Sequence, residues 1–118
     1  MQNPYNLEVY KMAYELSKDV IKEIENFKGK YRLQEQLLGA ITSIPANLME
    51  FCSISKPTQQ SEKLRVCIGE AFEAEYWLNL CKDLEMIDKP KADQLLQRLI
   101  EVRKRLFNLR DSVKGRED

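Results

Sequence analysis

The sequence predicts an all-α protein, an up-down-up-down antiparallel four-helix bundle that forms a single domain over residues 1–118. Three observations predict it: apolar residues recur at helical spacing in four stretches, the breaks between the stretches are short, and the chain has only four glycines and four prolines. With 43% hydrophobic and 32% charged residues, the composition is that of a globular protein rather than a disordered or fibrous one. A chain of 118 residues can bury one core but is too short for separate catalytic and substrate lobes.

The apolar residues stand three or four positions apart, so each stretch presents one apolar face when it is helical. The first stripe consists of Val9, Ala13, Leu16, Val20, Ile24 and Phe27, with one slip of register near its end. Three further stripes cover residues 37–51, 64–81 and 95–113. Four amphipathic helices follow from the four stripes.

The breaks between the stripes carry ordinary helix-end signals. Gly29 can adopt the positive φ that favours a helix C-terminus. Pro57 fits the first turn of the third helix, where a missing N–H costs nothing, and Asp88 fits the N-cap of the fourth. Connections this short join antiparallel neighbours.

Pro45 lies inside the second stripe, in "ITSIPANLMEF", residues 41–51. A proline there removes the hydrogen bond to the carbonyl of Ile41 and costs about 3 kcal/mol. Either one helix from about residue 31 to 52 kinks at Pro45, or one helix ends near Thr42 and another begins at Pro45. The unbroken stripe favours the kinked helix. Asn47 is expected to hydrogen-bond a carbonyl or a neighbouring helix.

The stretch "KYRLQEQLLGAITSIPANLMEF" resembles the second helix of the 23S rRNA intervening-sequence proteins, a family of four-helix bundles. In the third helix, "LRVCIGEAFEAE" is similar to the same family. The residues that coincide are Tyr31, Leu33, Gln36, Leu37, Ala40, Ser43, Ile44, Pro45, Ala46, Asn47 and Glu50 in the second helix and Leu64, Gly69, Glu73 and Glu75 in the third. The resemblance covers about residues 5–110.

This resemblance implies a ring-shaped homopentamer whose molecular activity is largely unassigned. A related bundle, the accessory variability determinant of diversity-generating retroelements, is a basic pentamer that binds a reverse transcriptase and nucleic acid. The chain departs from the family pattern at Leu38 and Gly39, where paired arginines are usual, and at Phe51, where glycine is usual. A nucleic-acid site that depends on the arginine pair therefore does not transfer to this chain.

Positive charge is concentrated in the fourth helix. Residues 1–88 hold ten Lys and Arg against fourteen Asp and Glu, a net −4, whereas residues 89–118 hold nine against five, a net +4. The candidates for binding RNA or DNA phosphates are Lys91, Arg98, Arg103, Lys104, Arg105 and Arg110. The alternative, which the neutral total charge favours, is that these cations pair with acids of adjacent helices, for which Glu62, Glu70, Glu73 and Asp83 are the candidates.

A second set of apolar residues flanks the main stripes, and one small bundle cannot easily bury all of them. The candidates for a subunit interface are Tyr10, Tyr14, Phe72, Trp77, Leu96, Ile100 and Phe107. The alternative is a wide core-facing stripe within one bundle.

The sequence offers little for catalysis, and we expect neither an enzyme nor a cofactor. It has no histidine, no glycine-rich phosphate loop and no metal-ligand spacing among its three cysteines. Cys67 and Cys81 fall on the core stripe, so Cys52 is the one candidate for an exposed thiol.

Two classes of function remain. The first is a homo-oligomeric accessory protein that binds RNA, DNA or a protein partner. The resemblance suggests a reverse transcriptase as the protein partner. The second is a structural or protein-interaction bundle without a nucleic-acid role. No apolar run approaches the roughly 20 residues of a membrane span, and no signal-peptide pattern opens the chain, so we expect a cytoplasmic protein without a membrane partner.

Overall fold

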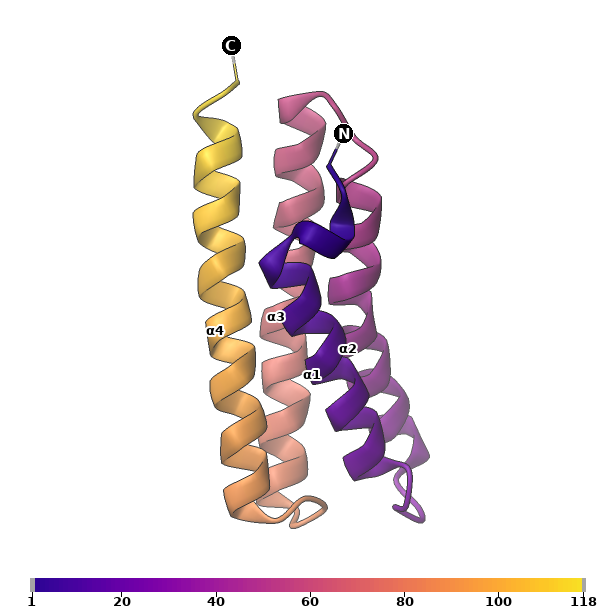
Figure 1. Ribbon diagram of the computed structural model, residues 1–118. Helices are drawn as coiled ribbons and strands as arrows, with labels where there is room; N and C mark the ends of the chain where they lie inside the picture. The colour runs from indigo at the N-terminus through magenta and orange to yellow at the C-terminus, as the bar shows by residue number, and fades with distance from the viewer. Residues whose placement is uncertain (1, 118) are drawn as a thin grey trace.

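The computed structural model describes residues 2–117 as four long helices, with no strand among these residues. A short 3-10 helix, η1 (Pro4–Asn6), precedes α1 (Glu8–Ile24), α2 (Tyr31–Phe51), α3 (Pro57–Asp83) and α4 (Lys89–Lys114). Consecutive helices run in opposite directions (Figure 1), which confirms the predicted four-helix bundle. None of these helices combines the length and the apolar character needed to cross a membrane.

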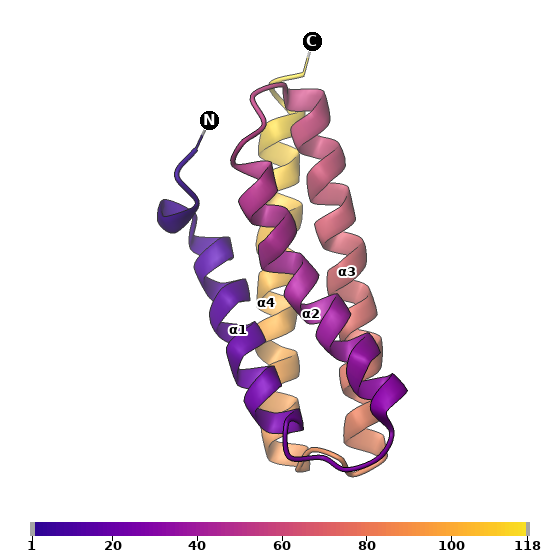
Figure 2. The ribbon, with the colours of Figure 1, turned by 90° about the vertical axis from the view of Figure 1, so that its right-hand side faces the viewer.

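The helices pack in a closed circuit. Contacts join α1 to α2, α2 to α3, α3 to α4 and α4 to α1, so α1 and α3 are diagonal neighbours. Figure 2 shows α1 and α3 on opposite sides, with α2 in front of α4. Because α1 has 17 residues against 27 in α3 and 26 in α4, the end of the bundle that holds the C-terminus of α4 extends beyond α1 (Figure 1).

The core consists of the predicted stripes. Every stripe residue is buried except Phe27 and Leu109, which are half-buried and pack against the core. The largest fully buried side chain is Phe51, at the C-terminal end of α2. Helical spacing in the sequence therefore located the core correctly in all four helices.

The connections match most of the predicted signals. Gly29 has φ +83° in the α1–α2 loop, and Pro57 occupies the first turn of α3. Asp88 stands at the N-cap position of α4, but its side chain makes no capping hydrogen bond. The position of Asp88 at the start of α4 was therefore predicted correctly, but the side-chain capping bond is absent.

α2 continues through Pro45 without interruption, so the alternative with two separate helices is wrong; the kink stays a prediction. Side chains supply donors around the proline. The Ser17 hydroxyl of α1 donates to the carbonyl of Ile41 at 3.0 Å, and Asn47 donates to the carbonyl of Ser43 at 2.8 Å. The Asn47 bond confirms the predicted carbonyl contact, whereas nothing in the sequence indicated Ser17.

Candidate functional site

Two of the six predicted phosphate-binding cations are held in ion pairs between helices. Arg98 of α4 lies 2.7 Å from the carboxylate of Asp19 in α1, and both side chains are about one-third exposed. The hydrogen bond from Arg98 lowers the pKa of Asp19, and the positive charge of the guanidinium acts in the same direction. Arg103 lies 3.1 Å from Glu75 of α3 and 4.6 Å above the ring of Phe72. These arginines join α4 to its two neighbours.

The acids in these pairs are not the predicted ones. Asp19 and Glu75 take the arginines, whereas Glu62 pairs with Arg65 in its own helix at 2.6 Å. Within residues 2–117, the carboxylates of Glu70, Glu73 and Asp83 form no ion pair. The prediction that arginines of the fourth helix pair with acids of adjacent helices is right for Arg98 and Arg103. The four acids that were predicted as their partners do not pair with them.

The other four cations differ in how available they are. Lys104 and Arg105 are exposed and make no ion pair within the part of the chain that the structure describes. Lys91 donates to the side-chain oxygen of Gln94 at 3.1 Å. Arg110 is half-buried, and its Nε has no hydrogen-bond partner within the described residues. Of these six cations, Lys104 and Arg105 are the two that are exposed and outside the ion pairs of residues 2–117.

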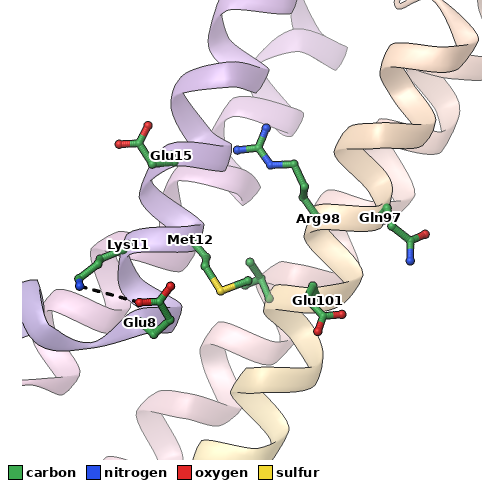
Figure 3. A pocket seen from close by; sticks show the side chains of 8 residues that line it. Glu8, Lys11, Met12, Glu15, Gln97, Arg98 and Glu101 are labelled. Atoms are coloured by element: carbon green, nitrogen blue, oxygen red, sulfur yellow. Dashed lines mark ion pairs between the residues drawn. The ribbon is translucent and has the colours of Figure 1, made fainter.

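A groove of about 460 Å³ separates α1 from α4 (Figure 3). Its walls are formed by Glu8, Lys11, Met12, Glu15, Gln97, Arg98, Glu101 and Val102. Met12 points across it toward α4, while Lys11 pairs with Glu8 at 3.8 Å (Figure 3). Both cations of the groove are paired, Lys11 with Glu8 and Arg98 with Asp19, and three of its lining residues are glutamates. The groove is therefore unsuited to binding a phosphate group. Sequence analysis missed this groove.

Exposed aromatic side chains gather on α3 and the adjoining part of α4, to which Phe107 belongs. Phe72, Tyr76 and Phe107 are 47%, 60% and 39% exposed, and Trp77 is half-buried beside Tyr76. The rings touch edge to face, with centroids 6.4 Å apart for Phe72 and Phe107 and 4.8 Å apart for Tyr76 and Trp77. These four residues form what we name the α3 aromatic surface.

A second apolar surface lies between α1 and α2. A groove of about 430 Å³ runs there, and its lining includes Tyr14, Ile21, Pro45 and Met49, with Lys18 as its one charged lining residue. Tyr14, Ile21 and Met49 are each more than one-third exposed. We name this the α1–α2 groove.

The predicted interface residues therefore divide into three groups. Tyr14, Phe72 and Phe107 are exposed, and Trp77 and Ile100 are half-buried. Tyr10 and Leu96 are only 8% exposed because they pack in the monomer core, as the wide-stripe alternative expected, so little of either remains for a second subunit. Tyr76 and Met49 were not predicted, although their positions beside the main stripes were a usable signal.

The cysteines are all buried, so the prediction that Cys52 is exposed is wrong. Burial raises the pKa of Cys52, raises that of Cys67 to about 12 and raises that of Cys81 to about 11. A thiol needs its thiolate form to attack an electrophile, and these environments disfavour it. Among the described residues, no group of His, Cys, Asp and Glu side chains is arranged to hold a metal ion.

Comparison with known proteins agrees with the helix sequences. The model of the 23S rRNA-intervening sequence protein family matches residues 5–108. Among solved structures, the fold resembles a protein of unknown function from the S23 ribosomal protein family of Bacteroides thetaiotaomicron VPI-5482, with a TM-score of 0.80. The two chains are 26% identical, and the match covers 86% of this chain and 96% of the other. No protein with a curated function matches.

Proposed function

The chain belongs to the 23S rRNA-intervening sequence protein family, and on that premise we propose that it is a non-enzymatic, homo-oligomeric accessory protein of the cytoplasm. The observation that carries the proposal is the α3 aromatic surface, where three large aromatic side chains are each more than one-third exposed. Exposed apolar patches mark contact sites for other proteins, and aromatic residues are enriched in such contacts. The resemblance of the second and third helices to this family implies that five subunits form a ring.

The chemistry of the chain supports a non-enzymatic role. It has no histidine to act as a general base near neutral pH. Its three thiols are buried, and burial raises their pKa values. The α1–α4 groove holds carboxylates and an arginine that is already paired, without a candidate nucleophile.

Measurement of native mass by light scattering tests the assembly. We expect the 13.9 kDa chain to elute as an oligomer and Phe107→Asp to shift it toward the monomer. Tyr31→Asp is the matched control, since Tyr31 is 65% exposed at the start of α2, away from the α3 aromatic surface. A monomeric wild-type protein at all concentrations would contradict the proposal.

Nucleic-acid binding is the second candidate function, and the unpaired charges of Lys104 and Arg105 favour it. A ring would bring one such pair from each subunit near the others, which raises the local positive potential. Titration with structured RNA and duplex DNA at two salt concentrations tests it. Binding that weakens steeply with salt and is lost in Lys104→Glu/Arg105→Glu is the expected result.

The control for this titration is Lys28→Glu/Lys30→Glu, which makes the same change of net charge in the α1–α2 loop. If both double variants bind equally, Lys104 and Arg105 are not the binding site. If the wild-type protein does not bind at low salt, a protein partner takes the place of nucleic acid. The resemblance makes a reverse transcriptase the first such partner to test, by co-elution of the two purified proteins.

A further inference from the structure

The two exposed apolar surfaces lie on different sides of the bundle. The α1–α2 groove is lined by residues of α1 and α2, and the α3 aromatic surface consists of α3 residues with Phe107 of α4. The groove lies between α1 and α2, whereas the aromatic residues belong to α3 and α4, so the two surfaces involve different helix pairs; Figure 2 shows the arrangement of these helices. A single bundle thus exposes two separate apolar areas of different composition.

The two surfaces differ in shape. The α1–α2 groove is a hollow of about 430 Å³ lined mainly by apolar side chains. On the α3 aromatic surface, by contrast, Tyr76 is 60% exposed and Phe72 47%, so their rings project into solvent. Aromatic rings that insert into an apolar pocket are the usual centres of tight protein contacts.

The charged residues at the two surfaces differ in sign. Lys18 is the one charged residue that lines the α1–α2 groove. Its ammonium lies 3.3 Å from Glu15 one turn away in α1, an exposed pair of the kind that contributes little to stability and can exchange partners. Glu70 and Glu73 lie on α3 next to the aromatic residues, and within residues 2–117 neither carboxylate forms an ion pair. Burial and the neighbouring Glu73 carboxylate raise the pKa of Glu70, so an added cation would relieve an unfavourable charge there.

We propose that the α1–α2 groove of one copy receives the α3 aromatic surface of a second copy, with Lys18 of the first facing Glu70 and Glu73 of the second. This inference rests on the proposed self-assembly and specifies how the copies meet. Each copy contributes a different surface to its two neighbours, so the contact is head to tail rather than two-fold symmetric. Such a contact leaves one free groove and one free aromatic surface at the ends of any incomplete assembly.

Mixing two variants tests this arrangement. Tyr14→Asp damages only the groove, and Tyr76→Asp damages only the aromatic surface; both residues are more than one-third exposed in the monomer. We expect each variant alone to be monomeric. An equimolar mixture should form a heterodimer that grows no further, because one intact groove meets one intact aromatic surface and the other two surfaces are damaged.

The outcomes separate the inference from the proposed function. An oligomeric wild-type protein, together with variants that keep its mass or a mixture that stays monomeric, would overturn the head-to-tail contact and leave self-assembly standing. A monomeric wild-type protein would remove both. Circular dichroism of each variant verifies folding, and Tyr14→Ala with Tyr76→Ala replaces the pair if the aspartates unfold the chain.

Charge reversal provides a second measurement. Lys18→Glu and Glu73→Lys should each weaken assembly by up to about fivefold, as expected for one ion pair at the edge of an interface, and together in one chain they should restore it. Lys56→Glu, in the exposed α2–α3 loop, makes the same charge change as Lys18→Glu and should have little effect. A combined variant weaker than both single variants would overturn the proposed pairing of the two surfaces.

Discussion

The hydroxyl of Ser17 in α1 donates a hydrogen bond to the carbonyl of Ile41 in α2, the carbonyl that Pro45 leaves without its i+4 donor. The oxygen–oxygen distance is 3.0 Å, and Ser17 is only 5% exposed. The same hydroxyl lies 2.9 Å from the carbonyl of Ala13, but that carbonyl already has the N–H of residue 17 as its helical donor. A neighbouring helix therefore satisfies a buried group that the proline would otherwise leave unpaired.

Removing this hydroxyl should destabilise the bundle through the unpaired carbonyl. We expect Ser17→Ala to lower the free energy of unfolding by about 1–3 kcal/mol, measured by urea denaturation. In a Pro45→Ala background the restored N–H can bond to Ile41, so the same substitution should cost about 1 kcal/mol or less. Equal costs in both backgrounds would show that Ser17 does not act through this carbonyl.

Ser43→Ala is the matched control for Ser17→Ala. The Ser43 hydroxyl donates to the Gly39 carbonyl at 2.6 Å within its own helix, where that carbonyl also has a backbone donor. Its removal should therefore cost less than the removal of Ser17.

The Arg98–Asp19 pair should make stability depend on acidity. Because Arg98 lowers the pKa of Asp19 in the folded state, the pair stabilises the fold above the ordinary aspartate pKa of about 4 and loses its contribution as the pH falls through the folded value. At one-third exposure the contribution is at most about 1 kcal/mol. Asp19→Asn should reduce the loss of stability between about pH 5 and pH 3. Urea unfolding at several pH values measures this loss.

Asp83→Asn controls for the loss of one carboxylate, since Asp83 is exposed and outside the ion pairs of residues 2–117. If both variants show the same pH dependence, the salt bridge does not couple folding to pH.

The thiols should react slowly with a water-soluble disulfide reagent while the protein is folded. All three cysteines are buried, and burial raises the pKa values of Cys67 and Cys81 to about 12 and about 11. We expect full reaction only in denaturant. Rapid modification of one thiol per chain at neutral pH, assigned to Cys52 with a Cys52→Ala variant, would contradict its burial.

Phe51 should contribute more to stability than any exposed aromatic residue. Its side chain is 1% exposed and is the largest fully buried side chain of the core. Phe51→Ala should cost about 3–5 kcal/mol by thermal or urea unfolding. Tyr31→Ala, at 65% exposure and outside the proposed contact surfaces, should cost much less, and similar costs would contradict the difference in burial.

The sequence by itself determined the helices, their order and their buried faces. The three-and-four spacing of residues such as Leu37, Ile41 and Ile44 is a local property, because it follows from the geometry of a single helix. Short loops then fixed the antiparallel order. The same reasoning placed Pro57 and Gly29 correctly, since their effects act on their own backbone angles.

The tertiary structure alone decided which side chains meet across helices. Arg98 and Asp19 are 79 positions apart, and no spacing rule connects them; their contact depends on how α1 and α4 rotate and slide in the packed bundle. The same packing buries Cys52, pairs Ser17 with Ile41 and leaves Tyr76 in solvent. Periodicity gives the direction of a side chain from its own helix axis, but a partner is defined only when two axes are placed together.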